Sequence, residues 1–177
     1  IVITIILALT LSRSPQISEG YLVQPSAYKT NAQFVEIESK QLDKRAQILA
    51  SYLSRFDSPL QYHTQDFIDA ADKYNVDWRL VPAIAGVEST FGKAIPGGYN
   101  AWGWGVYGTQ AIYFSSWNEA IFTIALGLRE NYINKGMTEP YSINRAYAAS
   151  PHWGGKVSYF MNDMEKFASE YRYIVVI

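Results

Sequence analysis

The 177-residue chain contains no cysteine, only two histidines and an 18% share of charged residues, which is low for a globular domain. The absence of cysteine excludes disulfides, thiol nucleophiles and thiolate metal ligands. His63 and His152 fall in expected loops without a second histidine at ligand spacing, so we expect neither a zinc site nor a Ser-His-Asp triad. The formal net charge of −1 leaves no strongly basic surface, which argues against a nucleic-acid-binding protein.

Aromatic residues, in contrast, are abundant. The chain has 5 Trp, 14 Tyr and 8 Phe, together 15% of its residues, within a hydrophobic content of 49%. This hydrophobic content excludes disorder over most of the length, and the chain is long enough for one domain with a core. Because flat rings stack on bases and on the apolar faces of sugars, we expect some of these rings to line a binding groove.

The N-terminal residues indicate the compartment. Residues 1–11 are apolar except for two threonines, and the first charged residue is Arg13. As a helix this stretch would be about 16 Å long, roughly half of the hydrocarbon core of a bilayer. We predict a truncated export signal or, since no clear cleavage site follows, the end of a membrane anchor; a buried core segment is the alternative. The protein is then exported and meets the membrane only through this segment, and residues 12–40 form a linker.

Hydrophobic periodicity predicts a mainly α domain over residues 41–172. Apolar stripes indicate helices within residues 42–56, 64–75, 77–91, 117–136, 143–148 and 157–171. Asp77 is expected to cap the third helix, and Trp78 and Trp117 fall on the stripes as core residues. Residues 92–115 are rich in glycine and aromatic residues, which predicts a loop or short hairpin with a strand at 111–114. The expected fold is a bundle of five or six helices with this insertion.

The insertion contains a G-x-G-x-x-G pattern at Gly103, Gly105 and Gly108, which is typical of dinucleotide-binding loops. Such a loop requires a strand before it and a helix N-terminus after it, so that backbone amides bind phosphate. Here a predicted helix precedes the pattern, and the rings of Trp104 and Tyr107 occupy its variable positions. We therefore expect no nucleotide site.

Glu88 is the carboxylate with the most informative surroundings. It lies late on the most apolar predicted helix, directly before the glycine- and aromatic-rich loop. Apolar and aromatic surroundings disfavour the charged form of a carboxyl group and raise its pKa, which makes Glu88 a candidate proton donor near neutral pH. The alternative is a structural role, in which Glu88 binds a loop amide or pairs with Arg79 or Lys93.

Three segments, in this order, resemble the lysozyme-like superfamily of peptidoglycan-cleaving enzymes: Glu88-Ser-Thr-Phe-Gly92, Asn100-Ala-Trp-Gly-Trp-Gly105, and Tyr147-Ala148 before the final helix. The first is similar to the catalytic helix of soluble lytic transglycosylases. The second resembles a segment of flagellar and autolysin-type glucosaminidases. The resemblance extends over residues 58–167 and implies a lysozyme-like helical bundle that acts on peptidoglycan glycan strands without a metal or an organic cofactor. We expect a monomer.

The resemblance also implies roles for single residues. Glu88 matches the general acid and base that protonates the glycosidic oxygen, and Tyr147 matches a tyrosine that faces this glutamate. A loop position among glycines favours glycan contact for its aromatic rings, whereas groove and core are equally compatible with Trp153. The expected substrate-binding residues are Ser89, Asn100, Trp102, Trp104, Tyr107, Tyr147 and Trp153.

The distribution of carboxylates bears on the mechanism. Most glycosidases use two carboxyl groups, but the next one after Glu88 is Glu119, which fits a capping box. Glu130, Glu139 and Asp163 have no context that recommends them. A single-carboxyl mechanism fits best, as in lytic transglycosylases, where the muramyl 6-hydroxyl replaces water. The alternatives are a hydrolytic N-acetylglucosaminidase or muramidase of the same superfamily, and a non-catalytic module that binds cell-wall glycan.

Overall fold

The computed structural model describes residues 43–105 and 112–174, the last three through their backbone only. The predictions for residues 1–11 and 12–40 and for Tyr107 lie outside the described residues. No helix of the described part is long and apolar enough to cross a membrane.

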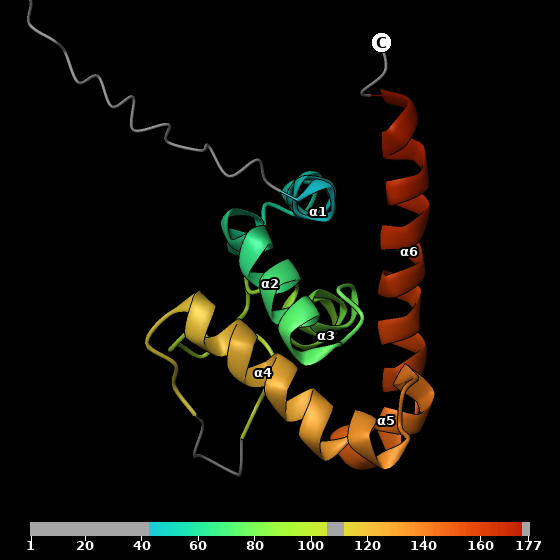
Figure 1. Cartoon of the computed structure of the whole chain (residues 1–177). Coiled ribbons are helices and arrows are strands. Elements are labelled where there is room, and N and C mark those ends of the chain that lie inside the picture. Colours follow the sequence, from blue (N-terminus) through green and yellow to red (C-terminus); the bar gives the residue numbers. More distant parts are fainter. Residues whose placement is uncertain (1–42, 106–111, 175–177) are drawn as a thin grey trace, which may run out of the picture. The chain divides into compact units, whose positions relative to one another are not determined.

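Six α-helices and two short 3-10 helices, η1 and η2, make up the described part (Figure 1). Their bounds are α1 Lys44–Ser54, η1 Pro59–His63, α2 Thr64–Tyr74, α3 Leu80–Ser89, α4 Trp117–Asn131, η2 Ile133–Lys135, α5 Pro140–Tyr147 and α6 Trp153–Ile174. The mainly α fold and the number of helices predicted from the sequence are therefore confirmed.

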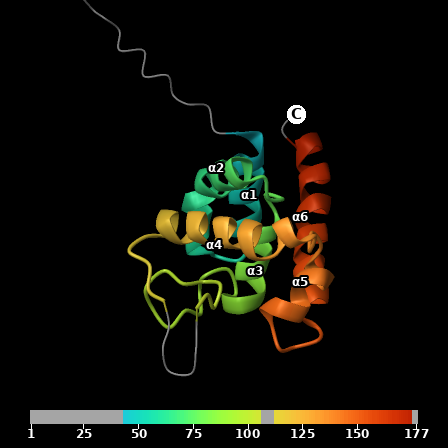
Figure 2. The same cartoon turned by 60° about the horizontal axis from the view of Figure 1, so that its bottom comes forward.

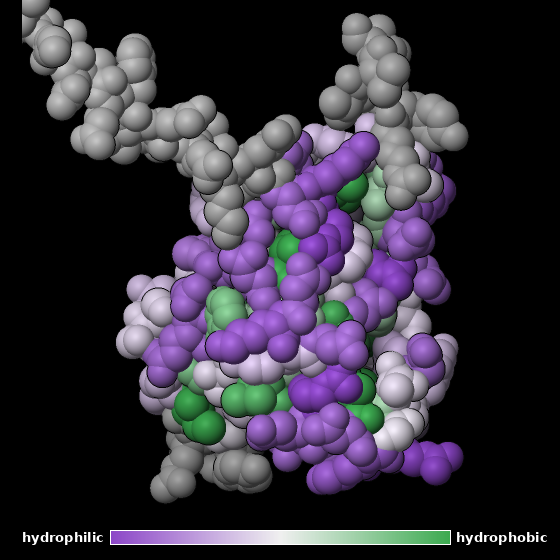
Figure 3. All heavy atoms as spheres, in the orientation of Figure 1, coloured by the Kyte–Doolittle hydropathy of each residue, from purple (hydrophilic) through white to green (hydrophobic). Residues whose placement is uncertain are grey.

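Helix α3 is the central element of the fold. Its first six residues, Leu80 to Ala85, are all buried, and a helix that is apolar on every side has to be covered on every side. Helices α4 and α6 pack against α3, α2 packs on α4, α5 packs on α6, and α1 contacts both α2 and α6 (Figures 1 and 2). The outer face seen in Figure 3 is mostly hydrophilic with separate apolar patches, as expected for helices that turn their apolar stripes inward.

Three predicted element boundaries are wrong. The helix predicted over residues 117–136 ends at Asn131, and the separate 3-10 helix η2 covers Ile133–Lys135. Helix α3 begins at Leu80 and not at Asp77, because the Asp77 carboxylate accepts hydrogen bonds from the backbone N–H (2.9 Å) and the guanidinium of Arg79 and forms a turn before the helix. The strand predicted at residues 111–114 is absent from its described part, residues 112–114. The backbone N–H of Phe114 donates to the oxygen of Gly98 at 2.7 Å, which joins the two ends of the loop.

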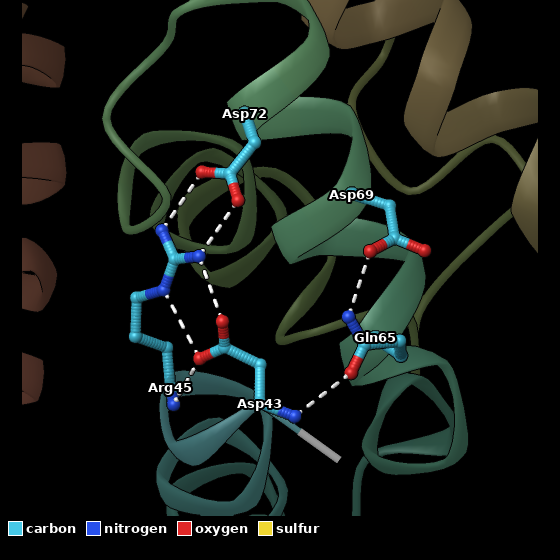
Figure 4. A network of polar contacts seen from close by, with 5 residues as sticks. All are labelled: Asp43, Arg45, Gln65, Asp69 and Asp72. Atoms are coloured by element: carbon cyan, nitrogen blue, oxygen red, sulfur yellow. Dashed lines mark hydrogen bonds and ion pairs between the residues drawn. The ribbon is translucent and has the colours of Figure 1, made fainter. Parts of the chain in front are cut away.

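A polar network fixes the start of α1 to α2 (Figure 4). The Arg45 guanidinium donates to both carboxylate oxygens of Asp72, at 2.8 and 2.7 Å, and to Asp43, which also caps α1. The backbone N–H of Asp43 donates to the side chain of Gln65 on α2, which in turn donates to Asp69. Hydrogen bonds from Arg45 hold the pKa values of Asp43 and Asp72 below their usual range. The network orients α1, and its partial exposure keeps its contribution to stability small.

Candidate active site

Glu88 lies in the last turn of α3, where the buried helix reaches the surface. Shortly after it, Thr90, Phe91 and Gly92 have φ angles of 51°, 57° and 81°, all in the left-handed region, so the chain reverses at once. The backbone N–H of Phe91 donates to the oxygen of Ala85 at 3.0 Å and closes this reversal. The side chain of Glu88 is therefore exposed at the end of a helix that is otherwise rigidly packed.

The carboxyl group of Glu88 lies between α6 and the loop after α3. The indole Nε1 of Trp153 donates a 2.6 Å hydrogen bond to its Oε1. The other oxygen, Oε2, faces Gly103, where an added Cβ would lie 3.6 Å from it. Gly103 has a φ of 62°, and its lack of a side chain lets the loop backbone approach the carboxyl group. One carboxyl oxygen is thus held in place, and the other faces the loop.

The surroundings of Glu88 favour its protonated form. Although the Glu88 side chain is exposed as a whole, the partial desolvation of its carboxyl group raises the pKa above the ordinary value, and this effect outweighs the Trp153 hydrogen bond and the charge of Lys156, which both lower it. A carboxyl group with a raised pKa retains a proton that it can donate at higher pH. This property is the one expected of Glu88 from the sequence.

Tyr147 and Trp153 form a stacked pair next to Glu88. Their ring centroids are 4.6 Å apart with 23° between the planes. The Tyr147 hydroxyl donates to the backbone oxygen of Trp102 at 2.9 Å, and burial together with the charge of Glu88 raises its pKa well above the usual value. Because Tyr147 stays protonated and bonded to the backbone, it positions the Trp153 ring that in turn holds Glu88. The structure thus places both predicted aromatic residues at the glutamate, but the Trp153 side chain is 3% exposed, so its assignment to substrate contact is wrong.

A surface hollow of about 530 Å³ adjoins Gly103 on the loop side of the site. Trp104 forms one wall and packs closely against Gly127 of α4, where any added Cβ would clash with its indole ring. We refer to this cavity as the aromatic hollow, and its lining includes Gly103, Trp104, Ile112, Asn131, Tyr132 and Tyr147. Asn131 and Tyr132 were not predicted, because they come from the end of α4, far from the loop in sequence.

The prediction that Trp102 lines a groove is wrong. Its side chain is 0% exposed, and its Nε1 donates to the backbone oxygen of Val81 at 2.9 Å. The ring lies near Phe67 and Trp117 in the core, with centroid distances of 6.3 Å to both. Gly103, with its positive φ, separates Trp102 from Trp104, and the two rings occupy different environments: Trp102 is in the core and Trp104 lines the hollow.

Ser89 and Asn100 are also buried, which corrects their assignment to substrate contact. The Ser89 hydroxyl donates to the oxygens of Ala85 and Ala101 and accepts from the backbone N–H of Gly92. The Asn100 amide donates to the backbone oxygens of Trp104 and Ile112, at 2.8 and 2.9 Å, and accepts from two loop N–H groups. These side chains hold the loop in shape instead of facing a ligand.

The other carboxylates considered from the sequence have structural partners elsewhere or lie outside the hollow. Asp163 accepts a 2.8 Å hydrogen bond from the Tyr52 hydroxyl between α6 and α1. Glu119 accepts from the backbone and hydroxyl of Ser115 at the start of α4. No aspartate or glutamate lines the aromatic hollow in the described part of the chain. Among those residues there is also no group of three or more acidic or histidine side chains that could hold a metal ion.

A bundle in which five of the six described α-helices surround the buried sixth, α3, with a glutamate at the exposed end of that helix, is a lysozyme-like fold. Comparison with solved structures supports this class. The chain is similar to S. aureus autolysin E in complex with the muropeptide NAM-L-Ala-D-iGlu, with a TM-score of 0.61 and 20% sequence identity over 68% of this chain and 66% of that chain. It is also similar to a catalytic mutant of autolysin E in complex with the disaccharide NAG-NAM, with a TM-score of 0.60 and the same identity and coverage.

These similarities confirm the predicted lysozyme-like fold. The chain spans slightly less than two thirds of the length of the autolysin E chains that it matches. No protein-family model matches the sequence, and neither does any curated protein.

Proposed function

We propose that this protein cleaves β-1,4 glycosidic bonds in the glycan backbone of peptidoglycan and that Glu88 is its general acid and base. The observation that carries the proposal is the position of Glu88 at the exposed end of the buried helix α3, with a raised pKa and next to an aromatic hollow. The muropeptide and the disaccharide bound to autolysin E support a glycan of this class as substrate. Export to the cell wall, expected from residues 1–11, is part of the same proposal.

In the proposed reaction, glycan sugars lie in the aromatic hollow with a ring against Trp104. Glu88 donates its proton to the glycosidic oxygen, the bond to the anomeric carbon breaks, and positive charge develops on the sugar ring. The ionised Glu88 then accepts the proton of the nucleophile that attacks this carbon. Trp153 and Tyr147 are positioning residues in this scheme, because they fix the carboxyl group without being required to touch the sugar.

We further propose that the nucleophile is the 6-hydroxyl of the same muramyl residue, so that the protein is a lytic transglycosylase. An inverting hydrolase needs a second carboxylate about 6.5–9.5 Å from the first, with a water molecule between them. The next carboxylate after Glu88 in the sequence, Glu119, accepts hydrogen bonds from Ser115, and Asp163 accepts one from Tyr52, whereas a tethered hydroxyl attacks at a high effective concentration. The alternative is hydrolysis by an N-acetylglucosaminidase or muramidase, which the resemblance of residues 100–105 to glucosaminidases favours.

The products distinguish these two reactions. Digestion of purified peptidoglycan is expected to yield fragments with 1,6-anhydromuramyl ends, which weigh one water molecule less than fragments with reducing ends. Mass spectrometry of the soluble fragments measures this difference directly. Reducing ends without any anhydro product would contradict the transglycosylase and leave Glu88 as the acid of a hydrolase. Intact peptidoglycan that the protein merely binds would instead indicate a non-catalytic glycan-binding module.

A further inference from the structure

The turn between α5 and α6 is built around one buried side chain, that of Asn144. Asn144 belongs to α5 and is 7% exposed, although asparagine ordinarily turns its amide to water. Its Nδ2 donates to the backbone oxygens of Ala148 and Ser150, at 3.3 and 2.8 Å, and its Oδ1 accepts from the backbone N–H of Gly154 at 2.9 Å. One amide thus joins α5, the turn and the start of α6.

These hydrogen bonds lie on both sides of Trp153, the first residue of α6. The backbone N–H of Trp153 donates, at 3.2 Å, to the same Ser150 oxygen that accepts from Asn144 Nδ2. The N–H of Gly154, the next residue, donates to Asn144 Oδ1. Because the peptide groups on both sides of Trp153 are tied to one buried amide, the backbone that carries the indole is held in place.

The packing of α5 against α6 acts on the same segment. An added Cβ at Gly154 would lie 2.9 Å from the backbone oxygen of Pro140 at the start of α5, so the two helices approach each other through their backbones at this point. Tyr147, which follows Asn144 by about one turn of α5, stacks on the Trp153 ring. Helix α5 therefore holds Trp153 twice, by its backbone through Asn144 and by its ring through Tyr147.

We propose that Asn144 is a positioning residue for the catalytic acid: its amide fixes Trp153, and the Nε1 of Trp153 holds Oε1 of Glu88 at 2.6 Å. The three hydrogen bonds of the Asn144 amide go to backbone groups, so Asn144 acts on Glu88 through Trp153. This inference rests on the proposed function, in which Glu88 is the acid, and adds to it a residue outside the lining of the aromatic hollow.

The hydrogen bond from Trp153 has a measurable effect on Glu88. Because it stabilises the ionised carboxylate, it lowers the pKa of Glu88 and opposes the partial desolvation that raises this pKa. The charge of Lys156 on α6 also lowers it, and the Tyr147 hydroxyl on α5, whose own pKa is raised well above its usual value, stays neutral. A variant that loosens Trp153 and leaves Lys156 and Tyr147 unchanged should therefore raise the pKa of Glu88.

Asn144→Ala is expected to raise the pKa of the Glu88 carboxyl group and to move the alkaline limb of the cleavage rate to higher pH. A pH titration followed by nuclear magnetic resonance, on the side-chain carboxyl carbon of Glu88 and the indole N–H of Trp153, measures the pKa independently of activity. Trp153→Phe, which keeps a ring but has no Nε1–H group, should raise the pKa further. In the Trp153→Phe background Asn144→Ala should cause no additional rise, because the bond through which Asn144 acts is gone.

Ser142→Ala is the matched control on the same helix. The Ser142 hydroxyl accepts from the backbone N–H of Glu139 and donates to the backbone oxygen of Glu139, so the variant weakens the start of α5 and spares the hydrogen bonds around Trp153. It should lower the melting temperature by about 3–5 °C and leave the pKa of Glu88 unchanged. A merely structural role of Asn144 would give the same pattern as this control.

Asn144→Gln keeps the amide on a side chain that is one methylene longer, and it carries the test if Asn144→Ala does not fold; its rise in pKa should be smaller. An unchanged or lowered pKa of Glu88 in the folded variant overturns the inference, and so does a rise of the same size in the Trp153→Phe background, while cleavage by the wild type still supports the proposed function. The expected titration in a protein that does not cleave peptidoglycan would contradict the proposed function and leave Asn144 as the residue that positions Trp153.

Discussion

Replacement of Glu88 by glutamine is expected to reduce peptidoglycan cleavage by about 10²–10⁴-fold while folding and glycan binding persist. Glutamine has the shape of glutamate and an oxygen that accepts the Trp153 hydrogen bond, but it has no proton to donate to the glycosidic oxygen. The release of soluble fragments from purified peptidoglycan measures the activity. Glu130→Gln is the matched control, because Glu130 is an exposed residue of α4 outside the lining of the aromatic hollow, and its cleavage rate should equal that of the wild type.

Two further properties distinguish an acid catalyst at Glu88 from a structural residue. Because burial raises the pKa of Glu88, the cleavage rate should fall as the pH rises through that raised value. Burial also disfavours the ionised form in the folded state, so Glu88→Gln should be at least as stable as the wild type at neutral pH. This advantage should vanish below the ordinary pKa, where both folded and unfolded chains are protonated. Wild-type cleavage by Glu88→Gln, or a marked loss of stability, would contradict the assignment.

The position of Glu88 at the exposed end of an apolar helix could be predicted from the sequence because its signal is local. When a carboxylate lies at the end of an apolar helix and directly before a glycine-rich loop, the neighbouring residues alone indicate that its side chain reaches the surface. Residues 88–92 also resemble a catalytic helix. The order of the helices could be predicted for the same reason, since apolar stripes and caps such as Ser116 are properties of short segments. Even the boundary error at Asp77 is a local one, in which a turn takes the place of the first helical residues.

The direction of side chains in the loop could not be predicted from local signals. Trp102 and Trp104 are both flanked by glycine or alanine, and the sequence does not distinguish the ring that enters the core from the ring that lines the hollow. Which ring enters the core depends on the space beside Val81, which accepts the Trp102 hydrogen bond, and on Gly127, which makes room for Trp104; both residues belong to other segments of the chain. The burial of Asn100 could not be predicted either, since a polar residue in a loop is usually exposed. Here the loop folds around the Asn100 amide and buries it.

The aromatic hollow is a product of tertiary packing and has no sequence motif. It combines the loop after α3 with the ends of α4 and α5. Lys156 would read from the sequence as an ordinary exposed lysine of a long helix. Its position beside Glu88 depends on the packing of α6 against α3. The sequence therefore indicates the carboxylate proposed as the acid, and only the fold indicates what surrounds it.

Trp102→Ala is expected to destabilise the fold by about 3–5 kcal/mol, because it removes the largest fully buried side chain and leaves a cavity between α2, α3 and α4. The hydrogen bond from its Nε1 to Val81 is lost as well. For a domain of this size such a loss lowers the melting temperature by about 10–20 °C. Thermal and denaturant unfolding measure the change. Trp102→Phe, which retains a ring but not the Nε1–H group, should lie between the wild type and Trp102→Ala.

Trp104→Ala is the matched control for Trp102→Ala, since both substitutions remove an indole ring from the same loop. Because the Trp104 ring is half-buried, its removal should cost less stability than the removal of Trp102. Because the ring lines the aromatic hollow, its removal should also weaken the binding of a glycan oligosaccharide by about 1 kcal/mol, the contribution of one stacked ring. The two variants therefore separate folding from binding. A small change in melting temperature for Trp102→Ala, together with a large loss of oligosaccharide affinity, would contradict the core position of Trp102 and return it to the glycan-binding surface.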